Sequence, residues 1–378
     1  MRIGFDLRPF LTRETGVGVY VRNLLFELAR IDAEDEFFLV SASWKDRFPP
    51  ERVPPFARKR FRDLRWPVRL VDALWYGPGR PTLDAIFGAR LDLTHSPAPL
   101  PLPTKGRRIV TVCDLFFLDF PGQADPGARR HFLKRTGAAL KAADGIVVIS
   151  EFTRTALLER FDLDPDKILV THLGLEDARR AAPDPTAVAR TRAALGLEGE
   201  FLLFVGASEP RKNLPALIDA LAIVHERRGP IPLVIAGRPG AGQADLLRRI
   251  SARGLAEWVK MPGYLPDEDV RSLYHAAAAF VFPSFCEGFG LPLLEALAAG
   301  LPAAASGAAA LPEIGGDAVV YFDPLSTEEM AGRILEILSD TRLRESLRGK
   351  GPARAALFRW DRTAARTLEF YREVVGRA

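Results

Sequence analysis

The sequence predicts an α/β protein made of two doubly wound domains, each with a parallel sheet covered by helices. Three observations lead to this prediction. The chain has 378 residues, which is more than one hydrophobic core usually holds. Short β-branched or aromatic runs alternate with longer helical patterns in both halves, as in βαβ units. The 31 glycines and 30 prolines are spread along the chain, as expected where many short connections join the elements.

The first half contains six short apolar runs that we interpret as strands. A helical pattern at residues 19–30 follows the first of them, and the opening run lacks the long apolar core of a signal peptide. We therefore expect a first domain over residues 1–178. Its predicted strands are residues 2–7, 37–41, 91–95, 108–113, 145–150 and 168–171.

The second half repeats this alternation, which predicts a second domain over residues 179–359. The boundary is expected within residues 176–200, a polar, alanine-rich stretch with two prolines. The last segment, residues 360–376, has an amphipathic helical period and can pack on either half, including back on the first domain. The predicted strands are residues 201–206, 232–237, 259–262, 279–283, 303–306 and 319–322, and helices are expected at residues 214–228, 242–253 and 267–277.

Composition excludes several classes of protein. Hydrophobic residues make up 48% and charged residues 26%, which argues against disorder, collagen and coiled coil. The net charge of +4 is too small for a dedicated nucleic-acid binder. The two cysteines, Cys113 and Cys286, cannot build a disulfide framework or a cysteine-based zinc site. The apolar stretches are too short or too broken to span a bilayer, so we expect a cytoplasmic protein.

The strongest functional signal is the block PSFCEGFGLPLLEALAAG, from Pro283 to Gly300. A predicted strand ends there, a glycine-rich turn follows, and a helix begins near Leu291. The free amides and partial positive charge of a helix N-terminus suit a phosphate, and glycines let the backbone approach a ligand closely. We expect the turn to present Gly288, an exposed Phe289, and Gly290.

Two carboxylates flank this turn. Glu287 stands before the helix and Glu295 little more than one turn inside it. Both can accept hydrogen bonds from ligand hydroxyls, such as those of a sugar and a ribose. The simpler alternative is a strand-to-helix turn with a solvated Glu on each side, which has no need of two Gly and two Glu around Phe289.

A second signal is the pair of adjacent cations Arg211 and Lys212 in VGASEPRKN, residues 205–213. They open a predicted helix, where acidic side chains are ordinarily favoured, so they indicate an anionic ligand such as a diphosphate. A metal-free group transfer needs such cations, because a leaving nucleoside diphosphate gains negative charge at the transition state. The alternative is a solvated pair of loop side chains.

At these blocks the sequence resembles the retaining glycosyltransferases of family 4, whose GT-B fold has two Rossmann-like domains facing across a cleft. Glu287 and Glu295, with seven residues between them, match the family's signature. The match extends over nearly the whole chain, and its other parts are residues 15–18, 111–115, 206–213, 263–267 and 311–316.

The resemblance implies a retaining hexosyltransferase of polysaccharide biosynthesis, which moves a sugar from a nucleotide-sugar to a glycan or lipid-linked acceptor. In the family a Lys at the place of Lys212 contacts the diphosphate, and Arg211 stands in for a second basic residue that many members carry where this chain has Ala207. The EPRKN motif is similar to that of mannosyltransferase-like members, which favours GDP-mannose as donor. No cofactor is implied, since the nucleotide-sugar is a co-substrate.

The resemblance also implies a role for each residue of the donor pocket. Glu287 would hold sugar hydroxyls and Glu295 the ribose, while the backbone amides of Gly290 and Leu291 would stabilise the leaving diphosphate. The remaining residues expected at the donor are Gly16, Gly206, Gly237, Tyr264, Gly288 and Phe289.

Two motifs of the first half are expected to line the site as well. In ETGVGVYVRNLL, which begins at Glu14, the loop from Gly16 to Gly18 would close over the donor or shape the acceptor side, although a plain strand-to-helix turn explains it equally well. In TVCDLFFLDFP, residues 111–121, Asp114 can orient or deprotonate an acceptor hydroxyl, or merely cap a helix. The family usually has His where this chain has Cys113, and a thiol does not replace an imidazole. We interpret Cys113 as a buried structural residue.

We predict no metal dependence. No two of the five histidines have the i, i+4 spacing of a zinc-binding helix. The acidic clusters at residues 162–166 and 267–269 precede or begin helices, where acids are favoured in any case.

A basic stretch from Arg47 to Arg69 carries eight cationic side chains against two acidic ones, with aromatic residues between them. Such a stretch can rest on an anionic membrane surface at the inner face or guide a lipid diphosphate acceptor. A solvated loop with a few buried anchors explains it equally well, and no nucleic-acid-binding motif accompanies it.

Other functions remain open for this architecture. A non-catalytic nucleotide-sugar binder is conceivable because of Cys113, and a nucleotide-sugar epimerase would use the same fold. A phosphorylase would need a longer chain and a Lys placed for pyridoxal phosphate, and a dinucleotide-dependent oxidoreductase would need a G-x-G-x-x-G after a strand. Turnover of a donor with an acceptor present separates a transferase from a binder.

Overall fold

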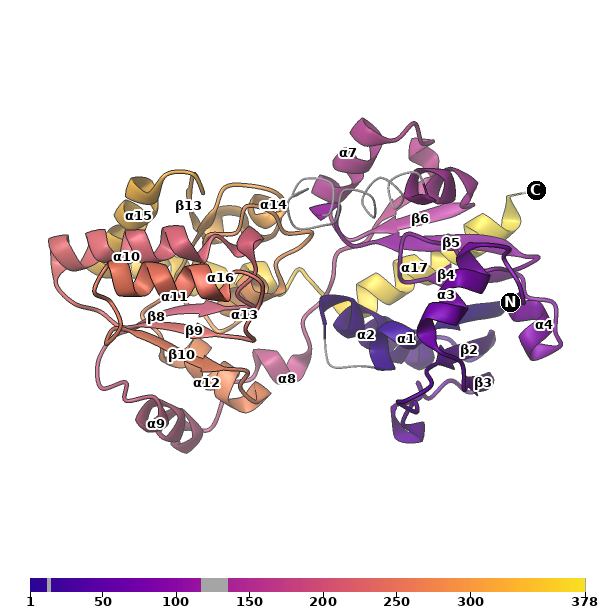
Figure 1. Ribbon diagram of the computed structural model, residues 1–378, viewed down its shortest axis with the longest axis horizontal. Helices are drawn as coiled ribbons and strands as arrows, with labels where there is room; N and C mark the ends of the chain where they lie inside the picture. Colours follow the sequence, from indigo (N-terminus) through magenta and orange to yellow (C-terminus); the bar gives the residue numbers. More distant parts are fainter. Residues whose placement is uncertain (12–14, 117–134, 378) are drawn as a thin grey trace. The chain divides into compact units, whose positions relative to one another are not determined.

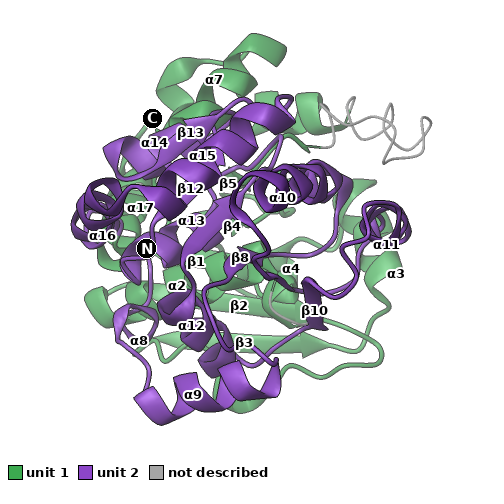
Figure 2. Ribbon diagram, turned by 90° about the vertical axis from the view of Figure 1, so that its left-hand side faces the viewer, with its two compact units in different colours: residues 1–174, 359–378 green, residues 175–358 purple. Residues whose placement is uncertain are grey.

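The computed structural model describes residues 1–11, 15–116 and 135–377, and the chain divides into two compact units. Unit 1 contains residues 1–174 and 359–378, and unit 2 contains residues 175–358 (Figure 2). The chain therefore enters unit 2 after Gly174 and returns to unit 1 after Phe358. Each unit has one sheet in which all neighbouring strands are parallel (Figure 1).

The seven-stranded sheet of unit 1 has the strand order β3-β2-β1-β4-β5-β6-β7. Helices cover its faces, so its inner strands are buried on both sides, as the adjacent and fully buried Phe37 and Phe38 show. The order changes direction between β1 and β4, which defines the switch point of a doubly wound sheet. Its strands are β1 (Arg2–Asp6), β2 (Glu36–Ala42), β3 (Lys59–Leu64), β4 (Leu93–Ser96), β5 (Arg107–Val112), β6 (Gly145–Val148) and β7 (Ile168–Val170).

The helices of unit 1 begin at polar caps in several places. Thr15 caps α2 by accepting a hydrogen bond from Gly18 N at 3.1 Å, and Ser150 caps α7 by accepting one from Thr153 N at 3.1 Å. The described helices are α1 (Arg8–Leu11), α2 (Gly16–Ile31), α3 (Val68–Tyr76), α4 (Leu83–Phe87), α7 (Glu151–Arg160) and α17 (Trp360–Gly376), with the short 3₁₀ turns η1 (Pro50–Arg52) and η3 (Pro165–Lys167).

Strand β3 is absent from our predictions, which treated this part of the chain as a single basic stretch. It pairs with β2 at the edge of the sheet, and its register sets Lys59 beside Phe37 and Leu64 beside Ala42. Edge strands tolerate charged side chains, so the sequence KRFRDL lacks the apolar run by which we recognised the other strands. The basic stretch is therefore neither one amphipathic segment nor a plain loop.

Helix α17 belongs to unit 1 and lies against α2. Tyr371 of this helix is fully buried, and its hydroxyl lies 2.5 Å from His95 Nδ1 at the carboxyl end of β4. The other ring nitrogen of His95 lies 2.6 Å from Thr111 Oγ1, which in turn lies 3.0 Å from the hydroxyl of Tyr20 in α2. This buried chain of hydrogen bonds joins the last helix to two strands and to α2.

The six-stranded sheet of unit 2 has the order β10-β9-β8-β11-β12-β13, with its switch point between β8 and β11. Its strands coincide with the six apolar runs predicted for this half, and the side chains of β11 and β12 are all buried. They are β8 (Leu202–Val205), β9 (Leu233–Ala236), β10 (Val259–Gly263), β11 (Ala279–Phe282), β12 (Ala303–Ser306) and β13 (Val320–Phe322).

The helices of unit 2 include two short ones within the stretch where we expected the domain boundary. The described helices are α8 (Asp177–Arg180), α9 (Pro185–Ala194), α10 (Leu214–Arg228), α11 (Gln243–Ala252), α12 (Asp267–Ala276), α13 (Leu291–Ala298), α14 (Leu311–Gly315), α15 (Thr327–Ser339) and α16 (Thr341–Ala355), with 3₁₀ turns η4 (Pro210–Lys212) and η5 (Gly316–Ala318).

Candidate active site

The two strongest sequence motifs meet at the switch point of the unit 2 sheet. The loop after β8 leads into η4, which carries Arg211 and Lys212, and the loop after β11 carries Glu287 and leads into α13. Because β8 and β11 are parallel neighbours, both loops leave the same edge of the sheet. In open α/β sheets this edge is where ligands bind.

Glu287 bridges the two cations. Its Oε1 lies 2.5 Å from Lys212 Nζ, and its Oε2 lies 2.9 Å from Arg211 Nη1. The Lys212 ammonium also lies over the ring of Phe282, 4.9 Å from its centroid. Side-chain exposure is 7% for Lys212 and 9% for Glu287, so this is a buried, charge-assisted network.

Charge around Glu287 keeps its carboxyl group ionised. Burial alone would raise the pKa of Glu287, but the neighbouring charges of Lys212 and Arg211 outweigh it and lower that pKa below its ordinary value. Arg211 also pairs with Glu209, at 2.8 Å between Nε and Oε2. The network thus holds two cations and one buried anion beside the start of α13.

Gly290 sets the start of α13. Its φ of +101° lies in the left-handed region, which disfavours residues with a Cβ. An added Cβ would also stand 2.7 Å from Leu311 Cδ2. Helix α13 begins at the next residue, Leu291, and the first amides of a helix have no partner within it. This backbone offers donors and a partial positive charge to an anion.

Phe289 is not exposed, which corrects the prediction made from the glycine-rich turn. Gly288 and Phe289 are both buried, and the Phe289 ring packs edge to face on Phe358 with centroids 5.7 Å apart. The bend at Gly290 turns this side chain inward, where burial of an aromatic ring is favourable. Phe289 therefore supports the turn from within unit 2.

Glu295 has a partner that the sequence did not reveal. Arg179 of α8 donates from Nη1 to Glu295 Oε1 at 2.9 Å and from Nη2 to Asp267 Oδ2 at 3.0 Å. Burial raises the pKa of Glu295, while the charge of Arg179 acts against that rise. A buried carboxylate generally needs a cationic partner, and this rule could have pointed to Arg179. Our prediction instead places the run EDARR, which contains Arg179, in the domain boundary.

Gly206 and Gly237 follow the adjacent strands β8 and β9. A Cβ at Gly237 would stand 2.0 Å from the carbonyl oxygen of Gly206, so close packing of the two strand ends requires this glycine. Next to them, the Arg238 guanidinium lies over the Tyr264 ring, 4.7 Å from its centroid, and 60% of Tyr264 is exposed. The pair forms a flat, cationic surface at the strand ends.

Gly16 and Asp114 belong to unit 1. Gly16 is the exposed first residue of α2, and an added Cβ there would contact nothing within 4 Å. Asp114 follows β5 and its Oδ1 accepts a hydrogen bond from Phe116 N at 3.2 Å. The neighbouring Cys113 is only half-buried, which corrects the prediction of a buried residue; desolvation, helped by the charge of Asp114, still raises the pKa of its thiol to about 12, so this thiol stays protonated at neutral pH. Glu14 and residues 117–121 of these motifs lie outside the described residues.

Within the described ranges, no group of three or more His, Cys, Asp or Glu side chains is arranged to hold a metal ion. In the same part of the chain, no helix combines the length and apolar character needed to cross a bilayer.

The chain matches two families over most of its length. Residues 15–179 match the family described as Glycosyltransferase Family 4, and residues 189–354 match Glycosyl transferases group 1. A relative from Escherichia coli, the O-antigen chain mannosyltransferase B, is 31% identical over 382 residues, which cover 98% of this chain and all of the relative. The serotype-specific mannosyltransferase WbdA of the same organism is 30% identical over 65% of this chain, which is 30% of its own length.

Solved structures share the fold of the whole chain. Sucrose-phosphate synthase from Thermosynechococcus elongatus has a TM-score of 0.78 at 21% identity and covers 100% of both chains. WaaG, a glycosyltransferase involved in lipopolysaccharide biosynthesis, has a TM-score of 0.76 at 18% identity, covering 99% of this chain and 100% of its own. Anabaena HepE, solved with UDP and glucose, has a TM-score of 0.75 at 18% identity and the same coverage.

The two parallel sheets and the structural relatives define a GT-B fold. The chain belongs to the group 1 and family 4 glycosyltransferases, and its relatives include mannosyltransferases. It is therefore a glycosyltransferase.

Proposed function

We propose that this enzyme transfers mannose from GDP-mannose, with retention of configuration and without a metal ion, to a glycan or lipid-linked glycan. The observation that carries the proposal is the Arg211–Lys212–Glu287 network at the start of α13. The relatives named as mannosyltransferases support the choice of sugar.

The cations are suited to the leaving group. As the bond between C1 of the sugar and the diphosphate breaks, negative charge grows on the departing oxygens. Arg211, Lys212 and the amides of Gly290 and Leu291 are fixed donors for that charge, and fixed donors stabilise a transition state without reorganisation. They supply the positive charge that a metal ion supplies in other transferases, which supports metal independence.

Glu287 is suited to orient the sugar. Its carboxylate is held by two cations and is ionised, so it is a preorganised acceptor for sugar hydroxyls. Glu295 would accept hydrogen bonds from the ribose, and Tyr264 with Arg238 offers a stacking surface for the base. Gly206 and Gly237 would let the backbone of the β8 and β9 ends approach the nucleotide.

Retention is explained by attack on the same face of the sugar. The acceptor hydroxyl oxygen forms the new bond to C1 as the diphosphate departs, and its proton passes to the departing phosphate oxygen. Asp114 of unit 1 would orient the acceptor hydroxyl, and the loop at Gly16 would close over the donor or shape the acceptor side. Cys113, with its protonated thiol, takes no charged part in these steps.

The test is a thermal shift with GDP, UDP, ADP and dTDP, each with and without EDTA, followed by turnover. A ligand that binds only the folded state stabilises it by about 2.7 kcal/mol at a hundredfold excess over its Kd. We expect GDP to give the largest shift, unchanged by EDTA, and NMR of the product to show the α-anomer of mannose. A shift abolished by EDTA would disprove metal independence, and hydrolysis or transfer with inversion would disprove retention. Binding without turnover would make the chain a nucleotide-sugar binder.

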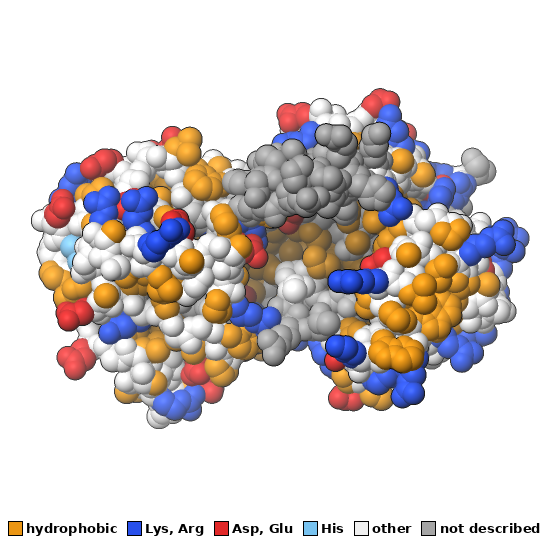
Figure 3. All heavy atoms as spheres, viewed as in Figure 1, with side chains coloured by type: hydrophobic (Ala, Val, Ile, Leu, Met, Phe, Trp, Pro, Cys, Tyr) orange, Lys and Arg blue, Asp and Glu red, His pale blue; other side chains and the backbone are white. Residues whose placement is uncertain are grey.

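We also propose that unit 1 contacts an anionic membrane surface. Ala42 and Leu64 are paired at the ends of strands β2 and β3, so the segments that follow these two strands start side by side. Each segment continues to an exposed apolar side chain. Trp44 is 67% exposed, and Leu70 of α3 is 47% exposed. Figure 3 shows hydrophobic side chains gathered over α3, with basic side chains around them. The exposed cations in this part of the chain are Lys45, Arg47, Arg58, Lys59, Arg60, Arg62, Arg65 and Arg69.

An exposed Trp and Leu bordered by cations suit the boundary between lipid headgroups and acyl chains. We expect the protein to float with phosphatidylglycerol vesicles but not with phosphatidylcholine vesicles, and less so at high salt. Trp44→Ser with Leu70→Ser should abolish flotation. Leu325→Ser, which removes an 81% exposed Leu from unit 2, is the control that should not. Equal flotation of both variants would disprove the proposed surface.

A further inference from the structure

Arg179 joins Glu295 to the point where the chain enters unit 2. It lies in α8, two residues after Asp177, and its guanidinium spans the carboxylates of Glu295 on α13 and Asp267 on α12. The contact with Glu295 is largely shielded from water, since side-chain exposure is 17% for Arg179 and 15% for Glu295. Shielded pairs of this kind constrain the position of both groups more than surface pairs do.

The groups that face Glu295 act in opposite directions on its charge. Burial favours the neutral carboxyl group, and the negative charges of Asp267 and Glu176 act in the same direction. Tyr274 of α12 is buried beside it, and burial raises the pKa of Tyr274 well above its ordinary value, so this neighbour carries no charge. Arg179 is the positive charge that opposes burial and the two acidic neighbours, and the neutral Tyr274 hydroxyl also acts to lower the pKa of Glu295.

We propose that Arg179 is a positioning residue that orients the Glu295 carboxylate and keeps it ionised for the ribose hydroxyls of the donor. A carboxylate only accepts hydrogen bonds, so it suits two neighbouring hydroxyl donors, whereas a neutral carboxyl group presents a proton of its own. The inference rests on the proposed function, because it needs a nucleotide ribose at Glu295.

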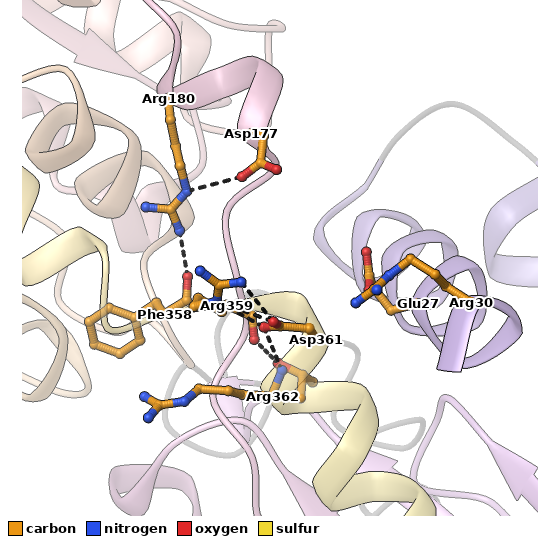
Figure 4. A network of polar contacts seen from close by, with 9 residues as sticks. Glu27, Arg30, Asp177, Arg180, Phe358, Arg359, Asp361 and Arg362 are labelled. Atoms are coloured by element: carbon orange, nitrogen blue, oxygen red, sulfur yellow. Dashed lines mark hydrogen bonds and ion pairs between the residues drawn. The ribbon is translucent and has the colours of Figure 1, made fainter. Parts of the chain in front are cut away.

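Arg180 provides a matched control on the same short helix. Its Nη2 donates to the carbonyl oxygen of Phe358 at 2.7 Å, and its Nε lies 3.9 Å from Asp177 (Figure 4). Its Nη1 donates to the carbonyl oxygen of Ala355 at 3.2 Å. Arg180→Ala therefore loosens α8 without removing the charge that faces Glu295. Any effect that Arg179 exerts only by holding α8 in place should appear in this variant too.

The first experiment measures the Kd of GDP-mannose for the full chain by calorimetry, without acceptor, over roughly pH 5.5 to 8.5. The phosphates of a nucleotide-sugar are diesters and do not titrate in this range. We expect wild-type affinity to fall toward low pH as Glu295 takes up a proton. Arg179→Gln should move that fall to higher pH and weaken binding about tenfold near neutrality, and Arg179→Lys should restore most of the affinity. Glu295→Gln should bind weakly with no such pH dependence, and Arg180→Ala should keep the wild-type profile.

The second experiment removes the ribose hydroxyls instead of the protein groups. GDP and its 2′-deoxy and 3′-deoxy forms are compared at pH 7.5 on the same variants. Loss of a hydroxyl should weaken binding to the wild type but have little effect on Arg179→Gln or Glu295→Gln, because coupled partners are not additive.

The outcomes distinguish a failure of the role of Arg179 from a failure of the proposed function. If Arg179→Gln keeps the wild-type pH profile and ribose dependence, Arg179 does not position Glu295 and the inference is overturned. If the wild type binds UDP-glucose instead of GDP-mannose, the same series is run with UDP-glucose. If the wild type binds neither, the proposed function fails and this inference fails with it.

Discussion

Lys212 contacts one carboxylate oxygen of Glu287 while Arg211 contacts the other, and this division of contacts allows their roles to be separated. Without Lys212, Glu287 keeps one cationic partner, but the diphosphate loses a fixed, buried donor. The donor itself still has Arg211 and the start of α13 to bind. Removing the Lys212 ammonium should therefore destabilise the transition state more than it weakens binding of the donor.

We predict that Lys212→Ala lowers kcat by roughly 100-fold or more, the usual effect of deleting one donor to a developing charge, and weakens donor binding by a smaller factor. Initial rates and calorimetric Kd values measure the two effects. Lys350→Ala is the control, because it removes an exposed Lys that pairs with Asp317 in the same unit.

Loss of Lys212 also leaves the buried Glu287 carboxylate with Arg211 as its remaining cationic partner. Removing one partner of a buried ion pair typically destabilises a fold by about 3 to 5 kcal/mol. The double variant Lys212→Met, Glu287→Gln removes both charges and should recover stability without recovering turnover. Turnover equal to the wild type in either variant would contradict the role of Lys212.

The same residues show what the sequence could predict about the site. Strand ends and glycine-rich turns place Arg211, Lys212 and Glu287 at one sheet edge, because carboxyl ends of parallel neighbours meet there. Side-chain pairing is decided by burial, which a single motif does not reveal. For this reason Arg179 was missed, and Phe289 was expected to be exposed although it packs on Phe358.

At the scale of elements, β3 and α17 show two different limits of sequence reasoning. Strand β3 lies at the sheet edge, and its charged side chains conceal its strand character. Helix α17 was predicted from the helical spacing of its apolar residues, but this spacing does not indicate which surface the apolar face packs against. Its partner is α2, and its anchor is the contact of Tyr371 with His95, residues 276 positions apart in the chain.

We predict that Tyr371→Phe destabilises the protein by about 1 to 3 kcal/mol, because it leaves a buried ring nitrogen of His95 without its partner. Chemical denaturation measures the loss. Tyr264→Phe, at an exposed ring in unit 2, should change stability by less than about 0.5 kcal/mol. Equal stability of Tyr371→Phe and the wild type would mean that this hydrogen bond does not anchor α17.

The same network makes a contribution to the pH dependence of stability. Burial lowers the pKa of His95 to about 3, whereas a His in the unfolded chain titrates near pH 6.5. Below about pH 6.5 only the unfolded chain takes up this proton, so stability falls as pH drops from there toward about 3.

At the scale of the whole molecule, unit 1 is built from both ends of the chain and unit 2 from one continuous segment. Alternation of strands and helices was sufficient to predict two doubly wound sheets, since buried parallel strands are apolar on both faces. It did not specify where α17 packs, because that depends on contacts between residues hundreds of positions apart. Long-range pairing of this kind is the information that periodicity lacks.

The first and last residues of unit 2 are themselves hydrogen-bonded, with Leu175 N donating to the carbonyl oxygen of Phe358 at 3.4 Å. Its ends therefore lie side by side, and Arg180 holds them together through the same carbonyl. An inserted segment whose two ends lie side by side can be removed or exchanged without displacing the two parts of the unit into which it is inserted, here unit 1. The proposed donor half is therefore one continuous segment, residues 175–358, and exchanging that segment would change the donor half while both parts of unit 1 keep their own sequence.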